Sequence, residues 1–102
     1  MELRKHPLLS YQGLPSWPPV WVSVETGEEE TTLHGEIGVL KHTHCNALSR
    51  KCYLLIDHEN TSYIGCLLCT DVPFCSQLAA ALEDNRGRTI LEIGGLDIYY
   101  PR

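Results

Sequence analysis

The feature that most constrains the fold is a pair of apolar segments, residues 52–57 and 62–69, separated by the polar residues 58–61. Each segment is apolar at consecutive positions, so both faces of an extended chain would be apolar. Short runs of this kind are typical of central strands that are covered on both sides. The pattern therefore predicts a β-hairpin in the middle of a sheet.

A helix is predicted directly after this hairpin, over residues 72–85. Asp71 is a suitable N-cap, and Pro73 fits the first turn, where its missing N–H costs little. Gly87 is a plausible stop. A single apolar stripe follows the spacing of one helix face, formed by Phe74, Cys75, Leu78, Ala79 and Leu82. We expect this stripe to pack on one face of the hairpin.

Two strands are predicted before the hairpin. Residues 20–24 and 35–44 have the β-branched and apolar content of strands. In the second of these, alternation places Ile37 and Val39 on one face, and Gly38, Leu40 and His42 on the other. The segment between them, residues 25–34, contains three adjacent glutamates and is expected to be a solvated acidic loop.

A last strand is predicted after the helix, in two parts, residues 89–93 and 96–100. Gly94 and Gly95 interrupt it and indicate a bulge or a bend. If this strand joins the same sheet, it runs parallel to the strand at 62–69 through a right-handed crossover.

These elements together predict an α+β fold. The expected sheet has about five mostly antiparallel strands, is open or curled like a small barrel, and carries one helix (about 72–85) on one face. Residues 1–16 are expected to form an irregular N-terminal arm and 17–102 a single globular domain. For the second face, cover by the segment around Trp17 and Trp21 or by curling is favoured, and a homodimer is the alternative.

The charge balance argues against nucleic acid as a partner. The formal net charge is -5, and the eight basic residues are scattered along the chain, whereas phosphate binding needs clustered Lys and Arg. No stretch reaches the ~18–20 apolar residues that span a bilayer, and no signal peptide is recognised at the N-terminus. We therefore expect a cytoplasmic protein without membrane association, whose five cysteines are free and mostly buried thiols.

Two histidines are candidates for a metal site. His42 and His44 lie two residues apart, so on a strand they share a face and can bind one ion. Cys45, His34 or Asp57 would supply a third ligand, and zinc is the expected ion. Local geometry fixes none of these ligands, so a polar strand end without a metal is the favoured interpretation. No cofactor is therefore expected, and a zinc site is the alternative.

The remaining cysteines have spacings that merit comparison with redox and zinc motifs. Cys66 and Cys69 form a C-x-x-C pair, but on a strand positions i and i+3 point to opposite faces, which favours structural thiols. Cys75 lies near the predicted helix start, yet on the apolar stripe, where core packing is expected. Residues 57–59 (Asp-His-Glu) match acid–base groups only in residue type, and we expect an exposed turn and no catalytic residues.

Several segments carry a resemblance to known sequences: WPPVW (17–21), GEIGVL (35–40), IDHE (56–59), SYIGC (62–66) and EIGGLD (92–97). With these segments the chain resembles a group of small bacterial proteins without an assigned activity. The resemblance covers about residues 13–100 and implies a single domain in the bacterial cytosol. It implies no activity and no site residues.

The absence of catalytic motifs favours a non-catalytic interaction or regulatory module that binds an unknown protein or small ligand, as a monomer or homodimer. Two alternatives stay open. One is a metal-binding protein that uses His42 and His44 with a cysteine or carboxylate. The other is a thiol-based enzyme or sensor that uses Cys69 or Cys75.

Overall fold

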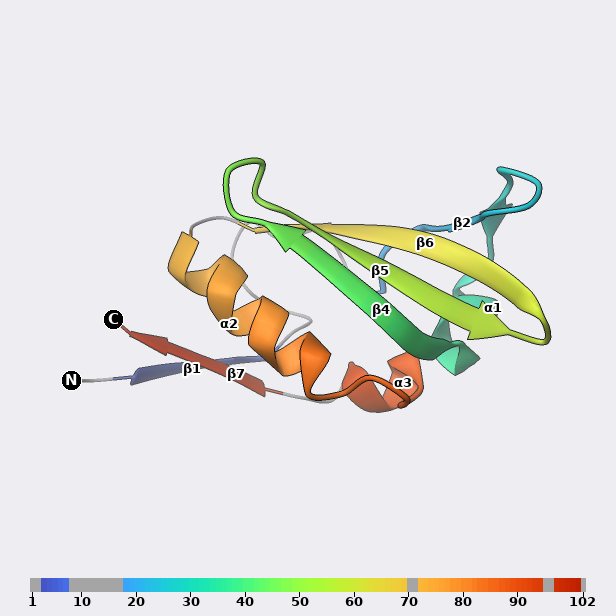
Figure 1. Cartoon of the computed structure of the whole chain (residues 1–102). Helices are drawn as coiled ribbons and strands as arrows, with labels where there is room; N and C mark the ends of the chain where they lie inside the picture. Colours follow the sequence, from blue (N-terminus) through green and yellow to red (C-terminus); the bar gives the residue numbers. More distant parts are fainter. Residues whose placement is uncertain (1–2, 8–17, 70–71, 95–96, 102) are drawn as a thin grey trace.

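The computed structural model describes residues 3–7, 18–69, 72–94 and 97–101. Its main feature is an open, antiparallel five-stranded sheet in the order β3-β2-β6-β5-β4 (Figure 1). The strands are β2 (Trp21–Ser23), β3 (Glu29–Glu30), β4 (Val39–Asn46), β5 (Lys51–His58) and β6 (Thr61–Leu68). The predicted α+β class is confirmed, as is the central place of the two strands of the hairpin. The sheet is not closed, so the barrel alternative is wrong.

The β5–β6 hairpin is joined by a two-residue turn. Eight residue pairs align the two strands, from Lys51 opposite Leu68 to His58 opposite Thr61. The turn residues Glu59 and Asn60 have φ values of 47° and 66°. Positive φ at both central positions gives the turn the twist that a two-residue hairpin needs, and Asn tolerates this conformation well.

Helix α2 (Val72–Glu83) lies along one face of this sheet (Figure 1), and we call this the inner face. Its apolar stripe is buried as predicted, with Phe74, Leu78 and Leu82 fully enclosed. The helix ends two residues before the predicted boundary, and the chain turns away at Gly87, where φ is +90°. The predicted N-cap at position 71 lies outside the described residues.

The core lies between α2 and the inner face of the sheet. Alternate residues of β5 point into it, namely Cys52, Leu54 and Ile56, all fully buried. Trp21 of β2 belongs to the same core, because a Cβ placed at Gly65 of β6 would lie 2.7 Å from its ring. The expectation that Trp21 covers the second face is therefore wrong; position 17 is outside the described residues.

The acidic segment forms more regular structure than predicted. Glu29 and Glu30 pair with β2, and a short helix, α1 (Thr32–Ile37), follows. The predicted strand at 35–44 therefore begins only at Val39, and Ile37 lies on a helix instead of a strand face. A two-residue strand and a six-residue helix are too short for periodicity to detect.

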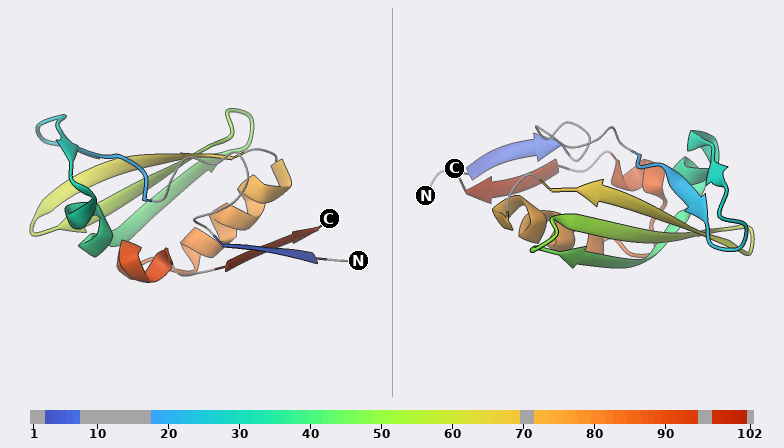
Figure 2. Two further views of the ribbon diagram at one scale, coloured as in Figure 1. Left: turned by 180° about the vertical axis from the view of Figure 1, so that it is seen from behind. Right: turned by 90° about the horizontal axis from the view of Figure 1, so that it is seen from above.

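The two ends of the chain form a separate ribbon. Strand β1 (Leu3–Pro7) pairs antiparallel with β7 (Asp97–Pro101), and β7 contacts α2 (Figure 2). Residues 3–7 were predicted to be irregular, and residues 96–100 to join the main sheet parallel to β6; both predictions are wrong. Because the residues of β1 pair with residues at least 90 positions away in the sequence, the local sequence carries no signal for this strand.

Residues 90–93, predicted as a strand, form a short helix, α3 (Ile90–Ile93). Thr89 is its N-cap: its Oγ1 accepts a hydrogen bond from the Glu92 N–H at 3.3 Å and donates one to Glu92 Oε1 at 3.0 Å. Thr-x-x-Glu is a capping sequence, so the chain itself indicates the helix start. Gly94 is the C-cap of this helix, and Gly95 lies outside the described residues.

A bulge in β4 changes which residues face the core. Leu40 is opposite Ile56, but His42 is opposite Leu55, so Lys41 is an extra residue in the edge strand. Before the bulge Leu40 is buried; after it His42 is exposed. The prediction that Leu40 and His42 share a face is therefore wrong.

Candidate functional site

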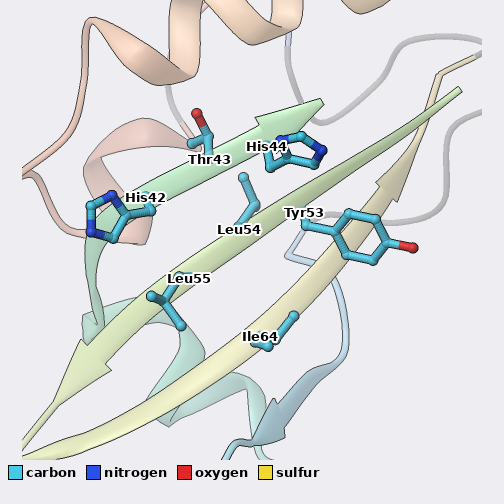
Figure 3. A pocket seen from close by; sticks show the side chains of 7 residues that line it. All are labelled: His42, Thr43, His44, Tyr53, Leu54, Leu55 and Ile64. Atoms are coloured by element: carbon cyan, nitrogen blue, oxygen red, sulfur yellow. The ribbon is translucent and has the colours of Figure 1, made fainter. Parts of the chain in front are cut away.

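His42 and His44 do share one face of β4, as predicted, and it is the outer face of the sheet (Figure 3). They line a pocket of about 170 Å³ together with Tyr53 of β5 and Ile64 of β6. Figure 3 places Tyr53 beside His44, and Leu55 near Ile64 at the other end. Small-molecule sites are usually cavities of about 300–1,000 Å³, so this pocket is shallow by comparison.

The structure does not bring the predicted third ligands to these two histidines. Cys45 is the next residue along the strand and points to the inner face, where it packs against the core. Asp57 accepts a hydrogen bond from Ser62 Oγ at 2.7 Å. His34 lies on α1, with its Nδ1 3.0 Å from Glu30 Oε2. Within the described ranges, His42 and His44 belong to no group of three metal-ligating side chains.

Cys45 is joined to Cys52 by a disulfide. The two residues are opposite each other in the β4–β5 register, and their Cα atoms are 4.0 Å apart. The expectation that all five cysteines are free is therefore wrong for this pair. The register explains this disulfide, because after the bulge Cys45 and Cys52 both face inward and lie opposite each other on neighbouring strands. No other cysteine is as close to either of them along the chain.

The thiols of Cys69 and Cys75 lie next to this disulfide. The sulfur of Cys52 is 3.7 Å from Cys69 Sγ and 3.9 Å from Cys75 Sγ. All three sulfurs lie within 4.8 Å of one another, and the three residues are at most 5% exposed. We call Cys45, Cys52, Cys69 and Cys75 the sulfur cluster.

Four different parts of the fold position the sulfur cluster. Cys45 and Cys52 come from neighbouring strands, and Cys75 comes from the buried stripe of α2. Cys69 follows β6, and its N–H donates to the Arg50 carbonyl at 2.7 Å, which extends the β5–β6 ladder by one pair. The cluster therefore lies where the central hairpin meets the start of the helix.

Cys66 is not part of the cluster. It lies on β6, half-buried, three residues before the fully buried Cys69. Cross-strand pairing places it opposite Tyr53, whose side chain lines the outer pocket. The prediction that the C-x-x-C cysteines point to opposite faces is confirmed, and so are the predicted burial of Cys69 and of Cys75.

The tip of the β5–β6 hairpin carries the residues at 57–59. His58 Nε2 is 3.9 Å from Glu59 Oε2, and its ring centre is 5.4 Å from that of His34. Glu59 is largely exposed. The side chain of His58 is only 19% exposed and Asp57 is also partly buried, so the predicted exposed turn holds for Glu59 and Asn60 and is wrong for these two residues.

The sulfur cluster supports two kinds of chemistry. A thiol beside a disulfide can exchange with it, and several thiolates that converge can bind a soft metal ion. The sequence does not reveal the cluster, because its pattern groups Cys45 with the histidines and favours core packing for the other cysteines. The available signal was the helix stripe, which placed Cys75 in the core facing the apolar hairpin.

No family model, curated protein or solved structure matches this chain. The resemblance to small bacterial proteins therefore stays a prediction. None of the helices within the described residues is long and apolar enough to cross a bilayer.

Proposed function

We propose that this chain is a small, non-catalytic regulatory module in which the sulfur cluster acts as a thiol–disulfide switch. The observation that carries this proposal is the 3.7 Å separation between the thiol sulfur of Cys69 and the disulfide sulfur of Cys52. Thiol–disulfide exchange requires a thiolate that can reach a disulfide sulfur, and these atoms already are neighbours.

The exchange needs no external oxidant. The thiolate of Cys69 attacks Cys52 Sγ, a Cys52–Cys69 bond forms, and the Cys45–Cys52 bond breaks. Cys45 leaves as a thiolate and takes up a proton from the solvent, so the number of disulfides is unchanged.

The two disulfide isomers differ at the surface of the domain. Cys69 and Cys52 are buried, whereas Cys45 is partly exposed on the edge strand β4. Exchange therefore moves the free thiol from the core to an edge, where an external thiol, oxidant or protein partner can react with it. A change of disulfide in the core therefore changes the reactivity of the domain surface at Cys45.

The tryptic pattern of the chain makes this proposal testable. Lys and Arg flank residues 42–50 and 52–86, so Cys45 falls on one peptide and the other four cysteines on the next. A Cys45–Cys52 bond joins the two peptides; a Cys52–Cys69 bond releases peptide 42–50 with a free thiol. Native oxidised protein is incubated with iodoacetamide, and the reaction is quenched with acid. The protein is then digested with trypsin without reduction, and the masses of the peptides are measured by mass spectrometry.

We expect Cys45 to become alkylated without added reductant, with an internal disulfide left on peptide 52–86. In Cys69→Ser this labelling should slow at least tenfold, while Cys66→Ser, the matched control, should behave like the wild type. Equal labelling rates in Cys69→Ser and the wild type would contradict exchange through Cys69.

The outer sheet face supports a second role in protein contact. Tyr53, Ile64 and Leu68 are 40–46% exposed there, which is high for large apolar side chains on neighbouring strands. The pocket on this face is small for a metabolite, so a protein surface fits it better. Sedimentation of the wild type and Ile64→Glu tests this role: self-association that Ile64→Glu leaves unchanged would contradict a homodimer through this face.

A further inference from the structure

The sulfur cluster has a second possible state, in which its disulfide is reduced. We infer that the reduced cluster is a binding site for Zn²⁺, with Cys52, Cys69 and Cys75 as three thiolate ligands and Cys45 as the fourth. This inference rests on the proposed function, because the same disulfide must open before Cys45 and Cys52 can bind a metal.

The spacing of the sulfurs matches the geometry that zinc requires. Zinc–thiolate bonds of about 2.3 Å in a tetrahedron place neighbouring sulfurs about 3.8 Å apart. The Cys52 sulfur is 3.7 Å from that of Cys69 and 3.9 Å from that of Cys75. The third distance is below 4.8 Å, so the three sulfurs lie close to three corners of such a tetrahedron.

The surroundings are those of a structural zinc site. The three sulfurs are buried and come from β5, the end of β6 and α2, so an ion would tie the hairpin to the helix. Cys45 supplies the corner nearest to solvent, since it is only partly buried on the edge strand. The ion can enter the site past Cys45. All four ligands are thiolates, which are common zinc ligands.

The two states exclude each other chemically. A reductant such as a phosphine or two small thiols supplies two electrons and the disulfide takes up two protons, which gives free thiols at Cys45 and Cys52. Each thiol that binds Zn²⁺ then releases one proton to the solvent. In the reverse direction, a two-electron oxidant such as a small-molecule disulfide takes two electrons from the thiolates of Cys45 and Cys52 and is itself reduced to two thiols, with protons taken from the solvent. The Cys45–Cys52 bond that forms removes two ligands and expels the ion.

The alternative metal site lies on the other face of the same strand. His42 and His44 are exposed on the outer face, and the sheet separates them from the sulfur cluster. A titration therefore distinguishes the two sites by mutation and by spectrum, because only thiolate ligands give an intense sulfur-to-metal charge-transfer band.

The experiment uses the full chain without a histidine tag. Protein reduced with a phosphine is titrated with Co²⁺, followed by its charge-transfer and visible bands, and then with Zn²⁺, which displaces the cobalt. The oxidised protein, the double variant His42→Ala/His44→Ala, and the variants Cys75→Ser and Cys66→Ser are treated in the same way.

We expect one equivalent of ion in the reduced wild type, the double histidine variant and Cys66→Ser. Affinity should fall at least tenfold in Cys75→Ser, and the oxidised wild type should show no charge-transfer band. Less than a tenth of an equivalent in the reduced wild type would overturn the inference. So would equal binding by the oxidised protein, or binding lost with the histidines.

The comparison of oxidised and reduced wild type does not depend on whether any variant folds. The peptide mapping of the proposed switch is done on oxidised protein with a chelator present, so it stands apart from the titration. If cobalt fails to bind while Cys45 is still labelled through Cys69, the zinc site is refuted and the switch is not.

Discussion

Reduction of the Cys45–Cys52 disulfide should lower the free energy of unfolding of the domain. The size of this loss depends on the number of residues in the loop that the bond closes. The bond closes a loop with a sequence separation of seven residues. In the chain-entropy model, a cross-link over a loop of this size lowers the entropy of the unfolded state enough to contribute about 2.5 kcal/mol at 25 °C. The reduced protein should remain folded, because all seven β4–β5 residue pairs stay available.

The same estimate applies after exchange. A Cys52–Cys69 bond would close a loop with a separation of 17 residues, for which the model gives about 3 kcal/mol. Reduction therefore costs about the same whichever isomer is present.

The assay is urea unfolding of the wild type with and without a phosphine reductant, followed by circular dichroism. A chelator is present in both samples, so that no metal stabilises the reduced form. With a urea dependence of about 1–3 kcal/mol per molar, the midpoint should fall by about 0.8–2.5 M. Cys66→Ser is the control and should show the same fall. A difference below about 0.5 kcal/mol would refute the reasoning, because it would mean that the bond does not constrain the unfolded chain.

Three substitutions test the packing around the site, each by the urea midpoint. Gly65→Ala should lower the free energy of unfolding by about 1–3 kcal/mol, because the added Cβ would lie 2.7–2.9 Å from the Trp21 ring and the Pro19 side chain. An unchanged midpoint would mean that the Trp21 ring does not lie against Gly65. Leu78→Ala should cost about 2–5 kcal/mol, since the side chain is fully buried against the sheet. The exposed Val72→Ala on the same helix should change stability by less than about 0.5 kcal/mol, and an equal loss in both would contradict the assigned helix face.

The parts of the fold that could be predicted are those with local signals. The β5–β6 hairpin and α2 are consecutive, and each carries a full apolar pattern, so their type and relative order follow from the sequence. The pairing of residues 3–7 with 97–101 could not be predicted in this way, because neither segment has a pattern that identifies its partner. Residues 90–93 are a different case: the Thr89-x-x-Glu92 cap was present in the sequence, and apolar content alone led to the strand assignment.

The sulfur cluster could be predicted only in part. The helix stripe and the strand alternation placed Cys75 and Cys69 in the core. They did not place Cys45, because the face of a β4 residue depends on its register with β5, and a single inserted residue reverses that face.

The inserted residue, Lys41, determines which side chains of β4 face the core. Leu40 is fixed inward, because its N–H donates to the Arg88 carbonyl, its carbonyl accepts from the Gly87 N–H, and it lies opposite the buried Ile56. Strict alternation from Leu40 would turn both histidines of β4 into the apolar core and Cys45 out to solvent. Burial of two imidazoles there would leave polar nitrogens without partners, which is costly.

The bulge avoids that cost and moves Cys45 to the inner face, opposite Cys52. The histidines and Cys45, which the sequence offered as ligands of one metal site, therefore lie on opposite faces because of one residue of register. The histidines lie on the outer face with the exposed apolar side chains, and the cysteine lies on the inner face beside the thiols of Cys69 and Cys75. For this reason the redox and metal chemistry that we propose would take place in the core, whereas the proposed protein contact would lie on the opposite side of the same sheet.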